Sequence, residues 1–250
     1  YSPEQEHDSC GVGVVANIKG GKSHQIIEEG MKVLVNLGHR GAAGSDPETG
    51  DGAGMLIQTP VKLFQREAAT LGFDLLPFGE YGVGMVFLPP DAQARTKGRD
   101  LINKVIEAEG LEVLGWRDVP LDHSKIGEDA RAVCPHICQV FIGGGPESKD
   151  TAQLERKLYV VRKVIEHSTQ EAGLAEEEAD CFYICSMSCK TIVYKGLLMA
   201  HQISDFYLDL KDTDLVSAFA LVHSRFSTNT LGSWRLAHPY RYLAHNGEIN

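Results

Sequence analysis

Short segments with the character of β-strands occur in adjacent pairs along this chain, and stretches with helical periodicity separate the pairs. The first strand is predicted over residues 10–18, where apolar side chains alternate with other residues before a Gly-Gly turn signal. The remaining predicted strands cover residues 55–58, 82–88, 112–116, 137–142, 182–186, 191–199 and 217–223. Strands in pairs, without strict strand–helix alternation, favour an α+β layered domain over a doubly wound parallel sheet.

Three helices are predicted from apolar residues that recur at helical spacing. The first follows Ser23, a residue type that caps helices, and ends near Gly38. The second is predicted over residues 98–109, and the third, which has the clearest period, over residues 152–167. Residues 168–180 are acidic and rich in Ala and Glu, which fits either a frayed helix end or a solvated loop.

The charge balance restricts the partners of the chain. Its 24 basic and 34 acidic residues give a formal net charge of −10, which argues against nucleic acid or an anionic membrane as the main partner. Uncharged apolar runs such as residues 215–222 are far shorter than the ~20 residues of a membrane span. We therefore expect a soluble protein of cytoplasmic type, or of plastids if the source is a photosynthetic eukaryote.

Six cysteines stand at positions 10, 134, 138, 181, 185 and 189. The spacing of Cys181, Cys185 and Cys189 would align three thiolates on a helix, so a regulatory or metal-binding module is one alternative. However, the residues between them are apolar and strand-like, which predicts burial, and no CxxC pair or histidine stands at zinc spacing.

Cys10 differs from the other cysteines because it opens a predicted strand directly before Gly-Val-Gly. Three later clusters carry polar chemistry: His39-Arg40-Gly41, residues 223–228 with Arg225, and His245-Asn246-Gly247-Glu248. Each has a structural explanation when taken alone. Arg40 could form a surface ion pair, Arg225 a buried one, and Asn-Gly is a common hairpin turn.

Taken together, these clusters resemble the class II glutamine amidotransferases, which are N-terminal-nucleophile hydrolases, and more narrowly the glutaminase domain of glutamate synthase. The residues that carry the resemblance are 9–13, 39–42, 49–54, 115–120, 186–188, 194–196, 206–210, 223–230 and 242–250. The resemblance implies a four-layer αββα fold, with two stacked, mainly antiparallel sheets between helices. It further implies a domain over residues 10–250, incomplete at its C-terminal end, preceded by residues 1–9 as a propeptide remnant.

The resemblance also implies a role for each site residue. Cys10, once freed at the chain terminus, would attack the side-chain amide of L-glutamine, with its own α-amino group as the general base. The amide of Asn246 and the backbone N–H of Gly247 would form the oxyanion hole. Arg225 would hold the substrate α-carboxylate, and Arg40 would lie near the nucleophile.

The same resemblance implies partners outside this segment. Ammonia would pass to 2-oxoglutarate in downstream synthase domains that hold flavin mononucleotide and an iron–sulfur cluster, whereas this segment itself would hold no cofactor or metal. A small reductase subunit or ferredoxin would supply electrons. The acidic residue that holds the substrate α-amino group is expected beyond Asn250, so a 250-residue fragment is expected to be inactive alone.

Two further alternatives stay open at this stage. The chain could be the glutaminase domain of a different class II amidotransferase, of the phosphoribosyl, glucosamine-phosphate or asparagine synthetase type. Residues 115–120 and 226–230 disfavour that alternative. The second alternative is that the chain is a catalytically inactive scaffold. The amidotransferase hypothesis expects the five cysteines other than Cys10 to be buried and unreactive.

Overall fold

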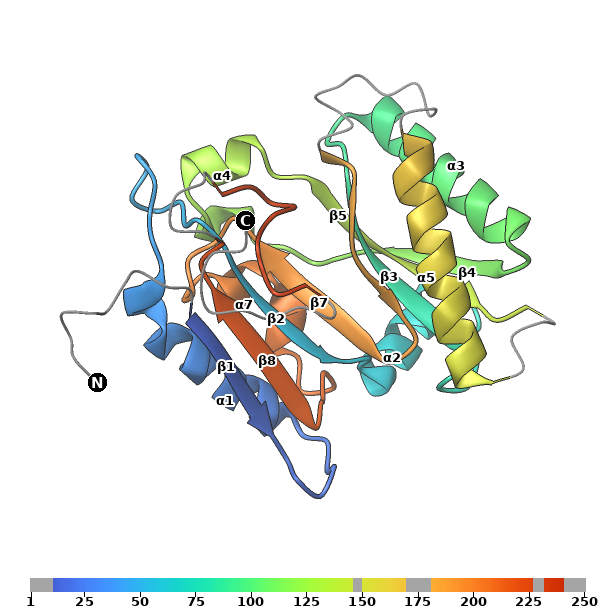
Figure 1. Cartoon of the computed structure of the whole chain (residues 1–250), viewed down its shortest axis with the longest axis horizontal. Coiled ribbons are helices and arrows are strands. Elements are labelled where there is room, and N and C mark those ends of the chain that lie inside the picture. Colours follow the sequence, from blue (N-terminus) through green and yellow to red (C-terminus); the bar gives the residue numbers. More distant parts are fainter. Residues whose placement is uncertain (1–10, 146–149, 170–180, 227–231, 241–250) are drawn as a thin grey trace.

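The computed structural model describes residues 11–145, 150–169, 181–226 and 232–240. Its strands form two four-stranded sheets, in which every pairing is antiparallel (Figure 1). Sheet I has the strand order β1-β8-β2-β7, and sheet II has the order β4-β5-β3-β6. Together with the flanking helices they make an α+β fold, which confirms the predicted fold class.

The elements have the following bounds. Sheet I contains β1 (Gly11–Ala16), β8 (Phe219–Ser224), β2 (Ala53–Gln58) and β7 (Thr191–Gly196). Sheet II contains β4 (Glu112–Asp118), β5 (His136–Gly143), β3 (Tyr81–Leu88) and β6 (Tyr183–Ser188). The α-helices are α1 (His24–Asn36), α2 (Val61–Leu71), α3 (Ala92–Ala108), α4 (Glu128–Ala132), α5 (Thr151–Ser168) and α7 (Ile203–Phe206). The 3-10 turns are η2 (Gly38–Arg40), η3 (His123–Lys125) and η5 (Leu208–Lys211).

Each predicted strand is present, with shifted ends. Strand β1 stops at Ala16, and Ile18, which was predicted to lie in it, is fully exposed beyond the strand. Strand β7 ends at Gly196, three residues before the predicted end at Met199. Helix α3 begins six residues earlier than predicted, because the carboxylate of Asp91 accepts hydrogen bonds from the first free backbone N–H groups of the helix.

Helix α1 lies against one face of sheet I at close range. A Cβ atom placed on Gly30 would lie 2.8 Å from Cβ of Ala220 on β8 and 3.1 Å from Cε of Met55 on β2. The glycine therefore lets the helix approach the sheet more closely than a side chain would allow. Ile27 and Leu34 on the same helix are fully buried. This contact fixes the position of the turn that follows α1 and carries Arg40.

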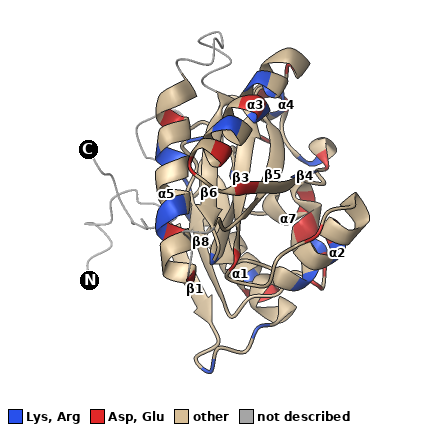
Figure 2. Cartoon of the chain, turned by 90° about the vertical axis from the view of Figure 1, so that its right-hand side faces the viewer, with Lys and Arg blue, Asp and Glu red and all other residues tan. Residues whose placement is uncertain are grey.

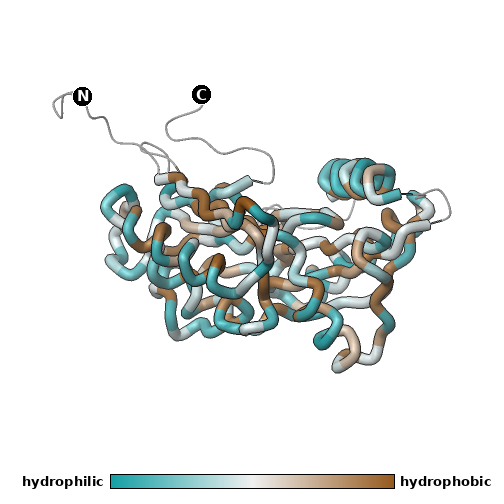
Figure 3. The backbone as a smooth tube through the Cα atoms, turned by 90° about the horizontal axis from the view of Figure 1, so that it is seen from below, coloured by the Kyte–Doolittle hydropathy of each residue, from teal (hydrophilic) through white to brown (hydrophobic). Residues whose placement is uncertain are grey.

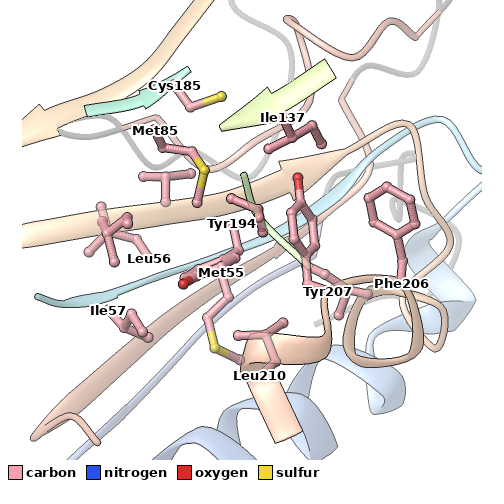
Figure 4. Packing of buried hydrophobic residues seen from close by; sticks show 14 of the residues in the cluster. Met55, Leu56, Ile57, Met85, Ile137, Cys185, Tyr194, Phe206, Tyr207 and Leu210 are labelled. Carbon is pink, nitrogen blue, oxygen red and sulfur yellow. The ribbon is translucent and has the colours of Figure 1, made fainter. Parts of the chain in front are cut away.

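The two sheets share one hydrophobic core. It includes Met55 and Tyr194 from sheet I, together with Phe206, Tyr207 and Leu210 from the α7–η5 segment (Figure 4). The ring centroids of Tyr194 and Tyr207 are 5.3 Å apart. A second apolar cluster lies between sheet II and the two long helices α3 and α5, with side chains such as Ile102, Leu158 and Val140. Helices thus cover sheet II on the side that faces away from the shared core.

A buried ion pair crosses the interior. Arg117 on β4 donates two hydrogen bonds to Asp209 of η5, at 2.8 and 2.7 Å, and the two side chains are only 4% and 2% exposed. The hydroxyl of Tyr194 donates to the same carboxylate, whereas Arg117 also donates to Gln139 and Glu67. The network therefore ties β4, β5, β7, α2 and η5 together through the Arg117–Asp209 pair.

The outer surface is polar. Basic residues (Lys and Arg) and acidic residues (Asp and Glu) are interspersed along α2, α3 and α5 (Figure 2). Hydrophobic and hydrophilic residues alternate over short distances along the backbone (Figure 3), as expected for amphipathic elements around a core. Among the residues that the structure describes, none of the helices combines the length and apolar character needed to cross a membrane.

Candidate active site

One end of sheet I brings together segments that are far apart in the sequence. Gly11 on β1 pairs with Ser224 on β8, Ser224 pairs with Ala53 on β2, and Ala53 pairs with Gly196 on β7. Gly11 is the residue that follows Cys10 in the chain, and Arg225 is the residue that follows Ser224. The register of the sheet therefore places the start of β1 beside the end of β8.

Arg40 lies at the same end of the sheet. It belongs to η2, directly after α1, and its Cβ atom would lie 3.3 Å from a Cβ atom placed on Gly11. A Cβ atom placed on the next residue, Gly41, would lie 3.4 Å from Oγ of Ser224. The 38–41 turn thus contacts the start of β1 and the end of β8. His39, by contrast, is exposed, and its Nδ1 atom lies 2.9 Å from the carbonyl oxygen of Asn36.

Arg225 has an unusual backbone conformation. Its φ angle is +79°, a region that residues other than glycine seldom adopt, and it is the single non-glycine residue with positive φ among those described. Its backbone N–H donates a 2.7 Å hydrogen bond to the carbonyl oxygen of Gly52. Its Nε atom lies 3.3 Å from Oδ2 of Asp51. Strained residues that the surrounding structure holds in place are concentrated at functional sites, which favours a functional role for this arginine.

Asp51 is the acidic partner in this arrangement. Burial raises the pKa of its carboxyl group to about 6, because the low-dielectric surroundings disfavour the charged form. The nearby guanidinium of Arg225 and a hydrogen bond from the backbone of Phe226 act in the opposite direction. The carboxyl group of Asp51 is therefore expected to gain its proton in the mildly acidic range, which changes the net charge of the Asp51–Arg225 pair.

A cavity of about 190 Å³ opens between these elements. Its lining includes Gly41, Asp51, Gly52, Ser224 and Leu198, so it lies at the same end of sheet I. For comparison, an apolar cavity of ~150 Å³ accommodates benzene. The space thus suits a molecule of the size of an amino acid, bordered by one carboxylate.

The predicted site residues have different outcomes. The structure brings Arg40 and Arg225 to the same end of sheet I, next to Gly11. Cys10, Asn246 and Gly247 lie outside the described residues, so their predicted roles stay predictions.

Sequence reasoning assigned no role to Asp51, although it noted the segment around it. The available signal was a single acidic residue between two glycines, Gly50 and Gly52, just before a strand. Such a residue has little side-chain cover from its neighbours, which suits a carboxylate that borders a cavity.

The cysteines require a correction. Cys138, Cys185 and Cys189 are buried, and burial raises the pKa of each thiol to about 12. Cys134 and Cys181, however, are only partly buried, whereas all five had been expected to be buried. The reason is position, because both precede a strand of sheet II instead of lying within it. Within the described ranges, no group of three or more His, Cys, Asp or Glu side chains is placed to hold a metal ion.

Comparison with known proteins identifies the family. Residues 10–250 match the model of the class-II glutamine amidotransferases. The chain is 52% identical over 251 residues to the large chain of an NADPH glutamate synthase from Bacillus subtilis (strain 168), an alignment that covers 100% of this chain and 16% of that protein.

Two further relatives are similar over almost the whole chain. An NADH glutamate synthase from Schizosaccharomyces pombe (strain 972 / ATCC 24843) is 44% identical, over 100% of this chain and 12% of that protein. A chloroplastic ferredoxin-dependent glutamate synthase from Oryza sativa subsp. japonica is 43% identical, over 98% of this chain and 15% of that protein. This chain therefore spans about a sixth or less of the length of these relatives. The match over residues 10–250 shows that the chain belongs to the class-II glutamine amidotransferases.

Proposed function

We propose that this chain is the glutaminase portion of a glutamate synthase, and that it hydrolyses L-glutamine to glutamate and ammonia. The observation that carries the proposal is the convergence at one end of sheet I. There Gly11, next to Cys10 in the chain, lies beside Arg40 and beside the strand that leads into Arg225. The similarity to glutamate synthases over nearly the whole chain supports it further.

In the proposed mechanism, Cys10 becomes the first residue of the domain after residues 1–9 are removed. Its thiol, with an ordinary pKa near 8.5, is mostly protonated at neutral pH, and a free α-amine with a pKa near 7.7–8.0 is well matched to accept that proton. A peptide nitrogen has no basic lone pair, so removal of residues 1–9 creates the base. The start of the family match at residue 10 supports this boundary.

The remaining site residues act on charge. The thiolate attacks the side-chain amide carbonyl, and the amide of Asn246 and the N–H of Gly247 stabilise the resulting oxyanion; one such donor typically contributes ~3–4 kcal/mol. Arg225 holds the substrate α-carboxylate, for which a planar guanidinium suits better than an ammonium group. Arg40 orients the nucleophile or the substrate from the η2 turn, beside the start of β1. Ammonia then leaves, and water hydrolyses the γ-glutamyl thioester.

Downstream domains would use the ammonia. We propose that it passes to 2-oxoglutarate, and that reductive glutamate synthesis there uses flavin mononucleotide, an iron–sulfur cluster and electrons from NADPH, NADH or ferredoxin. The described residues of this segment do not fit an iron–sulfur cluster, since they contain no suitable group of ligands and the buried thiols have raised pKa values. No step in this segment passes through such a group. The proposed compartment is the cytoplasm, or the plastid in a photosynthetic eukaryote.

The role of Arg225 is tested by steady-state kinetics of the full-length polypeptide. Arg225→Lys is expected to raise KM for L-glutamine about tenfold or more, with a smaller change in kcat, because a hydrogen bond to a charged group contributes about 1.5–3 kcal/mol. Arg156→Lys, at an exposed position on α5, is the matched control and should leave both constants unchanged. An unchanged KM in Arg225→Lys would contradict the assignment, and absence of glutamine hydrolysis in the unsubstituted protein would contradict the function itself.

The Asp51–Arg225 pair predicts a pH dependence of substrate binding. The carboxylate of Asp51 competes with the substrate carboxylate for the guanidinium, and it becomes neutral as pH falls through about 6. In a Cys10→Ala background glutamine is not consumed, so its binding can be measured directly. We expect the affinity of this variant for glutamine to increase several-fold as the pH falls from about 7.5 to about 5.5, because this range spans the pKa of Asp51. Calorimetric titration with an added Asp51→Asn substitution checks this. That variant should bind tightly at both pH values, and an unaltered pH dependence would contradict the competition.

A further inference from the structure

Lys195 on β7 is a lysine at a fully buried position. Its Nζ atom donates a 2.8 Å hydrogen bond to the backbone carbonyl oxygen of Arg235. The same atom lies 4.5 Å from the ring centroid of Tyr183 on β6 and 4.7 Å from that of Tyr240. Aromatic faces attract a cation most strongly where water is excluded. Two of the three partners of this ammonium group thus belong to one short segment, residues 232–240.

A charged lysine in the interior is costly unless it is compensated. The carbonyl oxygen of Arg235 and the rings of Tyr183 and Tyr240 provide the compensation. Burial lowers the pKa of Lys195 to about 7, and the groups that interact with it include the Cys185 thiol on β6 and Arg162 on α5. The amino group, whether protonated or neutral, therefore depends for its hydrogen bond on residues 232–240 keeping their position.

Residues 232–240 in turn contact the segment that holds Arg225. A Cβ atom placed on Gly52 would lie 3.3 Å from Cβ of Ala237, and one placed on Gly54 would collide with the carbonyl oxygen of His238. The ring of His238 stacks on His223 of β8, with centroids 4.5 Å apart. Gly52 supplies the carbonyl oxygen that accepts the backbone hydrogen bond of Arg225, and His223 is two residues before that arginine.

We propose that Lys195 is a positioning residue for the substrate-carboxylate side of the site: its Nζ atom, which donates to the carbonyl of Arg235, fastens residues 232–240 onto sheet I, and these residues hold the Asp51–Gly52 segment against Arg225. The proposal rests on the proposed function for the identity of the substrate. Lys195 itself touches neither the cavity lining nor the Asp51–Arg225 pair in the described contacts. It therefore acts through residues 232–240, and its loss should weaken substrate binding more than it slows the chemical step.

The test compares two lysine variants of the full-length polypeptide. Lys195→Met keeps most of the length of the side chain but removes its donor and its charge. Lys190→Met makes the same change at an exposed position in the β6–β7 turn. We expect Lys195→Met to raise KM for L-glutamine about tenfold, with a smaller loss in kcat, because displacement of a binding group by a fraction of an ångström is enough for an effect of this size. Lys190→Met should leave KM unchanged.

Hydrogen–deuterium exchange gives a second readout that does not require activity. In Lys195→Met, amides of residues 232–240 and 51–54 should exchange faster, whereas those of α3 and α5 should be unaffected. Tyr240→Leu removes one of the two rings and should produce the same pattern with a smaller change in KM. This milder variant keeps the proposal testable if Lys195→Met does not fold.

The outcomes separate the proposal from the function on which it rests. A lowered melting temperature of Lys195→Met with an unchanged KM in the remaining active protein would show a purely structural role and overturn the proposal. Unchanged exchange of residues 51–54 in both variants would overturn it as well. If the unsubstituted polypeptide hydrolyses no glutamine, the proposed function fails, and the exchange of residues 51–54 alone then decides whether Lys195 holds this segment.

Discussion

Cys10→Ala is expected to lower the rate of glutamine hydrolysis by about a thousandfold or more in the full-length polypeptide. The substitution removes the attacking sulfur, whereas alanine at the same position can still carry a free α-amino group. Loss of a nucleophile of this kind eliminates most of the rate enhancement, and the remaining site residues retain only a small part of it. Glutamate formation from added ammonia and 2-oxoglutarate should persist, because ammonia then bypasses the glutaminase site.

Cys181→Ala is the matched control for this prediction. Cys181 is a partly buried thiol before β6, at the far sheet from Gly11, and its loss should leave glutamine hydrolysis unchanged. Release of glutamate from glutamine is followed by a coupled assay under identical conditions for both variants. A tenfold loss in rate corresponds to an increase of only about 1.4 kcal/mol in the activation free energy. If Cys10→Ala retains a tenth or more of the activity, then Cys10 is not the nucleophile.

The second large effect concerns stability. Asp209→Asn is expected to destabilise the domain by about 3–5 kcal/mol, because it leaves the charge of Arg117 buried with its main partner neutralised. The two side chains are 4% and 2% exposed, so water cannot replace the missing carboxylate. Unfolding in urea, followed by tryptophan fluorescence, measures the change.

An exposed ion pair nearby provides the comparison. Lys211 lies 2.6 Å from Asp205, with side chains that are 53% and 47% exposed. Asp205→Asn should therefore cost about 1 kcal/mol or less. Equal destabilisation by the two substitutions would contradict the role assigned to the buried pair. Replacing both Arg117 and Asp209 by apolar residues should cost less than Asp209→Asn alone, since no unpaired charge remains.

Local pattern was sufficient for most of the fold. Alternation and turn residues located every strand in the part of the chain that the structure describes, because a strand that is buried on one or both faces has a recognisable pattern in consecutive residues. Helix α2 was missed, although Leu63, Phe64 and Ala68 form its buried face and Gly72 ends it in a left-handed conformation. The start of α3 was missed because its first turn has little apolar periodicity. The residue that indicates this start is Asp91, a residue type that caps helices.

Contacts between distant segments could not be predicted in the same way. Arg117 and Asp209 are 92 residues apart, and nothing near either residue indicates its partner. Residues 115–120 and 206–210 both resemble the family, yet their contact, through the Arg117–Asp209 pair and a hydrogen bond from the N–H of Leu208 to the carbonyl of Pro120, exists only in the folded chain. Arg40 and Arg225 were singled out separately for the same site, but their common location follows from the register of β1 with β8. Lys195 lies in the family-like segment 194–196, but nothing in that segment indicates its burial, which depends on residues 232–240.

The central claim is that Cys10 acts as an N-terminal nucleophile, and the mass and N-terminal sequence of the mature full-length protein test it most directly. The account predicts a chain that begins at Cys10, and modification of that residue by a diazo-ketone analogue of glutamine. A protein that hydrolyses glutamine while it still carries residues 1–9 ahead of Cys10 would contradict the claim, because the α-amino base would then not exist.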